Sequence, residues 1–110
     1  MARVLAFIPD LLFGSNVQGA LSAAGHEVEL VGRVESGLVA DVLVVDLTAD
    51  AGERIERVRD ARPHGVPVLA FYAHVEADVK QLAEEAGFEL VVPRSRMARE
   101  GAALVDRLSA

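Results

Sequence analysis

The sequence predicts an α/β fold built around one parallel β-sheet, and three observations carry this prediction. Five apolar runs lie at residues 4–8, 28–31, 42–45, 66–71 and 90–92. The first, third and fourth are continuous rather than alternating, which is typical of strands covered by helices on both faces. Helical patterns separate the runs, and right-handed crossovers then favour five strands in the order 2-1-3-4-5.

Apolar residues at helical spacing predict four helices between and after the strands. Gly25 is placed to end the first helix and Gly87 to end the third. Ser15 or Asn16 is the expected N-cap of the first helix, and the charged helix at residues 53–62 is expected to have a solvated outer face. The expected buried faces, from the first helix to the fourth, are Val17, Leu21 and Ala24; Ile55, Val58 and Ala61; Val79, Leu82, Ala83 and Ala86; and Ala98, Ala102, Val105 and Leu108.

The connection between the second and third strands is too short for a full crossover helix. Nine residues, 32–40, separate Val31 from Asp41, and glycines stand at positions 32 and 37. A parallel crossover that includes a helix and its turns needs a dozen or more residues. We therefore expect a single helical turn or a bare loop, so the second crossover helix is shortened or absent.

Length and composition indicate a single domain spanning residues 1–110. The apolar fraction is 52% and the charged fraction 25%, which are ordinary values for a chain that buries one core. The absence of cysteine excludes disulfides, thiolate metal sites and cysteine nucleophiles. A net charge of −6 without a Lys/Arg stripe argues against nucleic acid, and no apolar run approaches the ~20 residues that span a bilayer. We expect a cytoplasmic protein with no membrane partner.

Several segments resemble, in their order and spacing, the receiver domains of bacterial response regulators. Residues 3–7 (RVLAF) and 24–28 (AGHEV) are similar to the opening strand and the end of the first helix of a receiver. Residues 40–47 (ADVLVVDL) resemble the strand that carries the phosphorylated aspartate, and residues 66–73 (VPVLAFYA) and 86–93 resemble the fourth and fifth strands. The resemblance implies a CheY-like, flavodoxin-like three-layer α/β/α fold.

Receiver chemistry depends on groups at the tips of the strands. The family uses an acidic pair and a backbone carbonyl to bind Mg²⁺, an aspartate to accept the phosphoryl group, and a hydroxyl and a lysine to stabilise it. The resemblance places Asp46 at the acceptor position. Ile8 and Pro9 fall on the acidic pair, Tyr72 on the hydroxyl position and Val92 on the lysine position. Most of the phosphorylation chemistry is therefore missing.

The predicted pocket at this edge of the sheet comprises Ile8, Pro9, Asp10, Thr48, Tyr72, Ala73, His74 and Val92. We expect Ile8 and Tyr72 to fill the space of a phosphoryl group. We expect the Asp46 carboxylate to cap the following turn through the amide of Thr48 or Ala49. Asp10 and Asp46 are the candidate metal ligands, but a single carboxylate in place of the acidic pair is a poor anchor for Mg²⁺. No cofactor is expected.

The expected function is that of a stand-alone pseudo-receiver: a protein–protein interaction module in signal transduction, not an enzyme and not phosphorylated. Arg94, Arg96 and Arg99 form a basic cluster at the start of the last helix. Guanidinium groups bind carboxylates and phosphates, and the resemblance implies that this face contacts partners. The expected partner is another protein or a second copy of the chain.

Two alternatives remain open. One is an atypical phosphoacceptor that uses Asp10, Asp46 and Arg94 together with Mg²⁺. The other is a domain for a nucleotide or a flavin, since open α/β sheets bind ligands at the carboxyl ends of their strands. Residues 13–16 loosely resemble the phosphate loop of flavodoxins.

Overall fold

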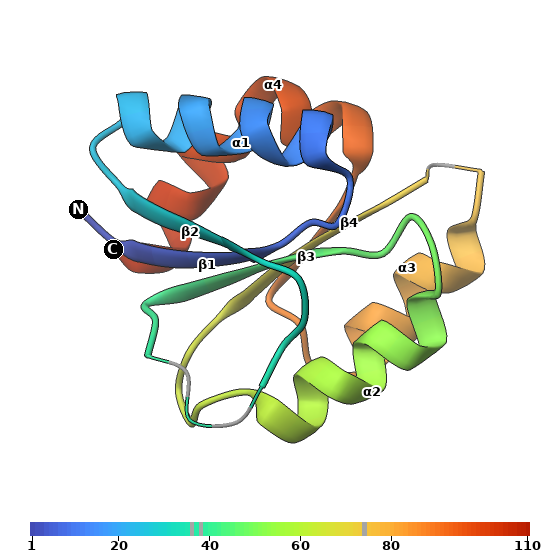
Figure 1. The fold of residues 1–110 in the computed structure, drawn as a ribbon. Helices are drawn as coiled ribbons and strands as arrows, with labels where there is room; N and C mark the ends of the chain where they lie inside the picture. Colours follow the sequence, from blue (N-terminus) through green and yellow to red (C-terminus); the bar gives the residue numbers. More distant parts are fainter. Residues whose placement is uncertain (36, 38, 74) are drawn as a thin grey trace.

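The computed structural model describes residues 1–35, 37, 39–73 and 75–110, and it contains one five-stranded parallel sheet with helices on both faces (Figure 1). The strands are β1 (Arg3–Phe7), β2 (Glu27–Val31), β3 (Val42–Asp46), β4 (Val68–Tyr72) and β5 (Leu90–Pro93). The helices are α1 (Leu11–Ala23), α2 (Ala51–Ala61), α3 (Ala77–Glu85) and α4 (Arg94–Ser109). The sheet order is β2-β1-β3-β4-β5, which confirms the order predicted from the sequence.

The connection between β2 and β3 contains no helix among its described residues, 32–35, 37 and 39–41. The prediction of a shortened or absent second crossover helix is therefore confirmed for this part of the chain. Val34 is buried in this connection and packs in the same core as Ile55 and Val58 of α2. One valine thus covers part of the sheet face that a crossover helix would otherwise cover.

Two cores lie on opposite faces of the sheet because successive strand residues point to opposite sides. Val4 and Ala6 of β1 belong to the core that α1 and α4 cover, and Leu5 and Phe7 belong to the core that α2 and α3 cover (Figure 1). All five residues of β3 and of β4 are buried, as expected of central strands.

Among the residues that the structure describes, none of the helices combines the length and apolar character needed to cross a membrane.

Helix α1 begins five or six residues earlier than the sequence predicted. Asp10 is its N-cap, and the Asp10 carboxylate accepts the backbone N–H of Phe13 at 3.1 Å. The prediction of Ser15 or Asn16 as N-cap was therefore wrong, because Asp10, three residues after the end of β1, is an equally good N-cap and comes earlier in the chain. Residues 13–16 lie inside α1, so they do not form a phosphate loop.

The buried face of α4 also differs from the prediction. Ala98 is exposed, and Met97, Gly101 and Leu104 are buried instead. Val105 is buried as predicted, and Ala102 and Leu108 are half-buried against the same core. The alanines of this helix fit either of two faces, and the larger Met and Leu side chains gain more free energy from burial. In α3, Val79 and Ala83 are buried as predicted, while Leu82 is half exposed.

His26 lies in the short connection between α1 and β2. The residue is buried between the first strand and the last helix. Its Nδ1 accepts the backbone N–H of Ala2 at 3.0 Å, and its Nε2 lies 2.7 Å from the Asp106 carboxylate. Because a backbone amide only donates, the ring proton belongs on Nε2, where it is donated to Asp106. His26 thus joins the start of β1 to the last turns of α4.

Arg62 and Glu89 connect α2 to the amino ends of β4 and β5. Arg62 Nε donates to the carbonyl of Val66 at 2.8 Å, and its Nη2 donates to Glu89 at 2.5 Å. The other Glu89 oxygen accepts the backbone N–H of Val68 at 2.8 Å. Burial raises the pKa of Glu89, but the hydrogen bonds from Val68 and Arg62 outweigh that effect and leave the pKa below its ordinary value.

A Glu89→Gln variant should be less stable than the wild type at pH 7 and should match it more closely in acid. A carboxyl group whose pKa is lower in the folded state stabilises the fold above its unfolded pKa of about 4.3. That contribution is lost as the pH falls through the folded pKa. Urea unfolding at both pH values measures the difference, with Glu84→Gln, which alters an exposed pair with Lys80, as the control. A difference in unfolding free energy between the wild type and Glu89→Gln that is the same at both pH values would contradict a lowered pKa of Glu89 in the folded state.

Candidate functional site

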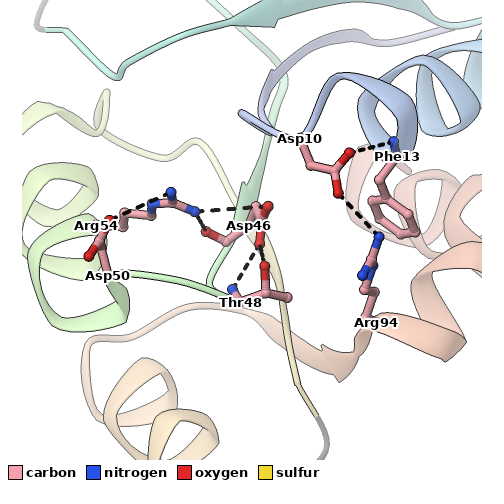
Figure 2. A network of polar contacts seen from close by, with 7 residues as sticks. All are labelled: Asp10, Phe13, Asp46, Thr48, Asp50, Arg54 and Arg94. Carbon is pink, nitrogen blue, oxygen red and sulfur yellow. Dashed lines mark hydrogen bonds and ion pairs between the residues drawn. The ribbon is translucent and has the colours of Figure 1, made fainter.

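The carboxyl ends of the strands bring polar residues to one edge of the sheet, where they form two groups (Figure 2). The acceptor cluster consists of Asp46, Thr48, Asp50 and Arg54, and the capping cluster consists of Asp10, Phe13 and Arg94. Within the described part of the chain, no hydrogen bond or ion pair joins the two clusters. The edge therefore holds two separate polar arrangements rather than one continuous site.

Asp46 ends β3 and is nearly inaccessible, with a side chain that is 5% exposed. Its Oδ1 accepts two hydrogen bonds from Thr48, one from the backbone N–H at 2.8 Å and one from the hydroxyl at 2.5 Å. These bonds confirm the prediction that the carboxylate caps the turn after the strand through the Thr48 amide. One of the two carboxylate oxygens is thus used by the chain's own turn.

Arg54 reaches the same carboxylate from the first half of α2. Its Nη1 donates to the main-chain oxygen of Asp46 at 2.9 Å and lies 3.8 Å from Asp46 Oδ2. Its Nη2 lies 4.0 Å from the carboxylate of Asp50, and the guanidinium carbon lies 5.3 Å from the centre of the Phe7 ring. The Arg54 side chain is 13% exposed, so this cation is largely buried beside Asp46.

This geometry compensates a buried negative charge from within the chain. A carboxylate that is removed from water is costly unless a cation or hydrogen bonds stabilise it. Thr48 supplies the hydrogen bonds and Arg54 supplies the cation. Because Arg54 is covalently part of α2, its charge does not exchange with solvent as a bound metal ion would.

The residues at this edge do not fit a Mg²⁺ ion. Magnesium requires near-octahedral oxygen coordination and is usually held by one or two carboxylates together with substrate oxygens and water. Among the described residues, no group of three or more His, Cys, Asp or Glu side chains is arranged to bind a metal. Asp10, the second candidate ligand, belongs to the capping cluster instead.

The capping cluster connects α1 to the start of α4. Asp10 Oδ1 accepts the Phe13 amide, and Asp10 Oδ2 lies 3.4 Å from Nη2 of Arg94. The guanidinium of Arg94 lies over the Phe13 ring, 4.3 Å from its centre, which is within range of a cation–π interaction. The charge of Arg94 is therefore directed to Asp10 and Phe13 and not to Asp46.

The remaining residues of the predicted pocket are distributed over both faces of the sheet. Ile8 and Val92 pack in the core under α1 and α4, whereas Tyr72 packs in the core under α2 and α3. Ile8 and Tyr72 thus do not fill one common space, contrary to the prediction, because they belong to cores on opposite faces of the sheet. Pro9 is exposed and Ala73 is half-buried. His74 lies outside the described residues.

The basic cluster predicted at the start of α4 separates into two parts. Arg94 belongs to the capping cluster, while Arg96 and Arg99 pair with Glu100 at 3.3 Å and 3.8 Å. Arg99 is 68% exposed. Exposed pairs of this kind contribute little to stability, so Arg96 and Arg99 remain able to exchange partners.

Arg54 is the functional residue that sequence reasoning missed. It was assigned to the solvated face of the charged helix, yet it precedes the buried Ile55 and lies at the end of α2 that meets the strand tips. Its one detectable signal is the spacing of four residues from Asp50, which places the two side chains on one side of a helix. That spacing alone does not show that the guanidinium turns inward to Asp46.

A cavity of about 240 Å³ lies beside the acceptor cluster, on the side of β2. Its lining is formed by Phe7, Pro9, Gly32, Arg33, Asp50, Glu53, Arg54 and Arg57. Pockets for organic ligands are typically about 300–1,000 Å³. The cavity is therefore smaller than the pockets that typically hold organic ligands.

No protein-family model and no curated protein matches the sequence. Solved structures do match. NtrX from Brucella abortus is 18% identical to this chain and superposes on it with a TM-score of 0.81. The match covers 98% of this chain and 26% of NtrX, so this chain spans about a quarter of the length of NtrX. The non-phosphorylated HemR receiver domain from Leptospira biflexa has 18% identity and a TM-score of 0.80, and the match covers 100% of this chain and 95% of the HemR domain. An orphan response regulator of H. pylori has 16% identity and a TM-score of 0.78, and the match covers 98% of this chain and 96% of that regulator's chain. Together with the strand order, these likenesses show that the chain has the fold of response-regulator receiver domains.

Proposed function

We propose that the chain is a receiver-type signalling module that acts through protein contacts and is not switched by phosphorylation of Asp46. The observation that carries this proposal is the contact of the largely buried Arg54 guanidinium with Asp46. The receiver fold supports the signalling role, because the solved structures that share it are response regulators.

Phosphoryl transfer to a carboxylate depends on positioning and on compensation of the developing charge. Asp46 Oδ1 is occupied by Thr48, and Oδ2 faces Arg54. A phosphoryl donor that approaches Asp46 would have to displace these contacts, and no acidic pair is available to bring Mg²⁺ to its oxygens. The contacts of Asp46 therefore favour a carboxylate with a structural role over an acceptor.

The atypical phosphoacceptor is supported less well by the same geometry. That mechanism requires Asp10 and Arg94 to act on the phosphoryl group at Asp46. The two side chains instead pair with each other, and Arg94 is also stacked on Phe13. A module that offers a constant surface to a protein partner needs none of these groups to move.

The proposal is tested by titrating the protein with beryllofluoride and Mg²⁺ and following its amide NMR signals. We expect no saturable shift at Asp46, Leu47 or Thr48, while a phosphorylatable receiver domain under the same conditions shows one. Asp46→Asn is the matched control, since it removes the acceptor and keeps the side-chain size. Saturable shifts in the wild type that are absent from Asp46→Asn would establish the atypical phosphoacceptor instead.

A further inference from the structure

Strand β2 is an edge strand, and among the described residues no strand lies on its outer side. The backbone N–H of Glu27 donates to the Ala2 carbonyl at 2.9 Å, so Glu27 directs its backbone groups toward β1. Successive residues of a strand direct their N–H and C=O groups to alternate sides, so Val28 and Leu30 direct theirs away from the sheet. The outer side of β2 therefore presents main-chain donors and acceptors with which a further strand can pair.

One of these outward groups has a partner within the chain, which supports the assigned direction. The Gln18 side chain of α1 donates to the Val28 carbonyl at 3.2 Å. Within the described part of the chain, no hydrogen bond involves the backbone N–H of Val28 or either backbone group of Leu30. The strand also contains no proline, which would remove a donor from the edge. Gln18 thus covers one acceptor and leaves the other outward groups open.

The side chains of β2 give this edge one apolar and one acidic face. Val28 and Leu30 are half-buried against the core under α1 and α4. Glu27 and Glu29 point to the opposite face of the sheet, and both are exposed. A segment that extends the sheet at this edge must therefore carry apolar side chains on one face and side chains that suit carboxylates on the other.

The chain does not neutralise both of these carboxylates. Among the described residues, neither Glu27 nor Glu29 has an ion pair. Arg3 is the neighbour of Glu27 in the sheet register and offsets its charge, whereas the neighbour of Glu29 is the apolar Leu5. A hollow of about 170 Å³ lies at this edge, and its lining includes Arg3 and both carboxylates. Glu29 is thus the negative group that a cation of a docked segment would meet.

From this pattern we infer that the open edge of β2 binds an extended segment of a partner protein in which Lys or Arg alternates with β-branched apolar residues. The main chain of the segment pairs with Val28 and Leu30, and its cations lie beside Glu29. Opposite charges on neighbouring strands stabilise the pairing, and the net charge of −6 also attracts a basic partner.

A second copy of the chain does not meet these requirements. Pairing of two β2 strands would place Glu27 and Glu29 of one copy beside those of the other, and like charges on neighbouring strands destabilise a sheet. The inference rests on the proposed function and deepens it, because it gives the chemistry of the partner that the signalling module contacts.

Titration of the full chain with the acetylated and amidated peptide TKVKVKT, followed through amide NMR signals, tests the inference. We expect saturable shifts at Val28 and Leu30 and slower hydrogen exchange of these two amides in the complex. Glu29→Arg should raise the dissociation constant about tenfold, because it replaces an attractive pair by a repulsive one. Glu85→Arg makes the same change of charge at an exposed position of α3, so it is the matched control and should leave the dissociation constant unchanged.

Two altered peptides separate strand pairing from a general attraction between charges. Methylation of the valine backbone nitrogens of TKVKVKT keeps the peptide's charge and removes donors that pair with β2, so binding should be lost. The acidic peptide TEVEVET should bind Glu29→Arg more tightly than it binds the wild type, because the charges are then complementary again.

The inference is overturned if TKVKVKT does not bind, if the methylated peptide binds as tightly as its parent, or if Glu29→Arg and Glu85→Arg have equal effects. It is also overturned if TEVEVET does not prefer Glu29→Arg. Protection of Val28 and Leu30 that grows with protein concentration, without peptide, would assign the edge to a second copy and overturn it too.

These outcomes do not depend on Asp46, so they can be distinguished from a failure of the proposed function. A chain that binds no peptide and is inert to beryllofluoride contradicts the edge site alone. A chain that binds the peptide at β2 and responds to beryllofluoride contradicts the proposed function alone.

Discussion

Replacing Arg54 by methionine should lower the free energy of unfolding by about 2–3 kcal/mol. The substitution leaves the Asp46 carboxylate buried without its cation and removes the donor to the Asp46 main-chain oxygen. Thr48 still donates two hydrogen bonds to the carboxylate, so the loss should be smaller than for a fully isolated buried charge. Urea denaturation at pH 7 measures it.

Arg57→Met is the matched control, because Arg57 lies on the same helix but is exposed, and among the described residues its one ion pair is the exposed contact with Glu53. Its effect should stay below about 0.5 kcal/mol. Asp46→Asn should suppress part of the Arg54→Met loss, since the neutral amide does not require a cation. If the two substitutions had independent, additive effects, Arg54 would not be acting through the charge of Asp46.

Replacing His26 by alanine should cost about 2–4 kcal/mol of unfolding free energy. The variant removes a buried ring and leaves the Ala2 amide without an acceptor and the Asp106 carboxylate without its donor. Thermal unfolding followed by circular dichroism measures the loss. The exposed His64 provides the comparison, and His64→Ala should change the midpoint little.

A His26→Gln variant separates the hydrogen bonds from the packing of the ring. The glutamine oxygen can accept from an amide and its nitrogen can donate to a carboxylate, so this variant should recover part of the lost stability. Hydrogen exchange at the start of β1 should be faster in His26→Ala than in His26→Gln. Equal exchange in the two variants would indicate that His26 contributes through its volume alone.

The fold could be predicted from the sequence because local patterns determine its elements. The continuous apolar runs at β3 and β4 indicated strands buried on both faces, and Gly25, which follows the C-cap residue Ala24 of α1, adopts a φ of 93°. The lack of a full crossover helix between β2 and β3 could be predicted from the length of that connection alone. The buried face of α4 could not be predicted from the sequence, because Ala98 and Met97 are both apolar and only the shape of the core determines which of them is buried.

The candidate site was predictable where its contacts are local in sequence. The Thr48 amide lies two residues from Asp46, and a strand-end aspartate commonly bonds the turn that follows it. The pairing of Asp10 with Arg94 joins residues 84 positions apart, and His26 meets Asp106 across 80. Such contacts depend on how the helices are placed on the sheet. Arg54 is eight residues from Asp46, but its contact depends on the angle at which α2 begins.

The hydrogen bonds of His26 also determine how freely the chain could be rearranged. Because His26 bonds both Ala2 and Asp106, the two ends of the chain are neighbours in space, and Figure 1 shows them side by side. A short glycine-rich linker should therefore close the polypeptide into a ring without stretching it. Opening that ring at Gly32 would yield a circular permutant with the same sheet. In this permutant the new linker would join the segments that contain Ala2 and Asp106, the two partners of His26.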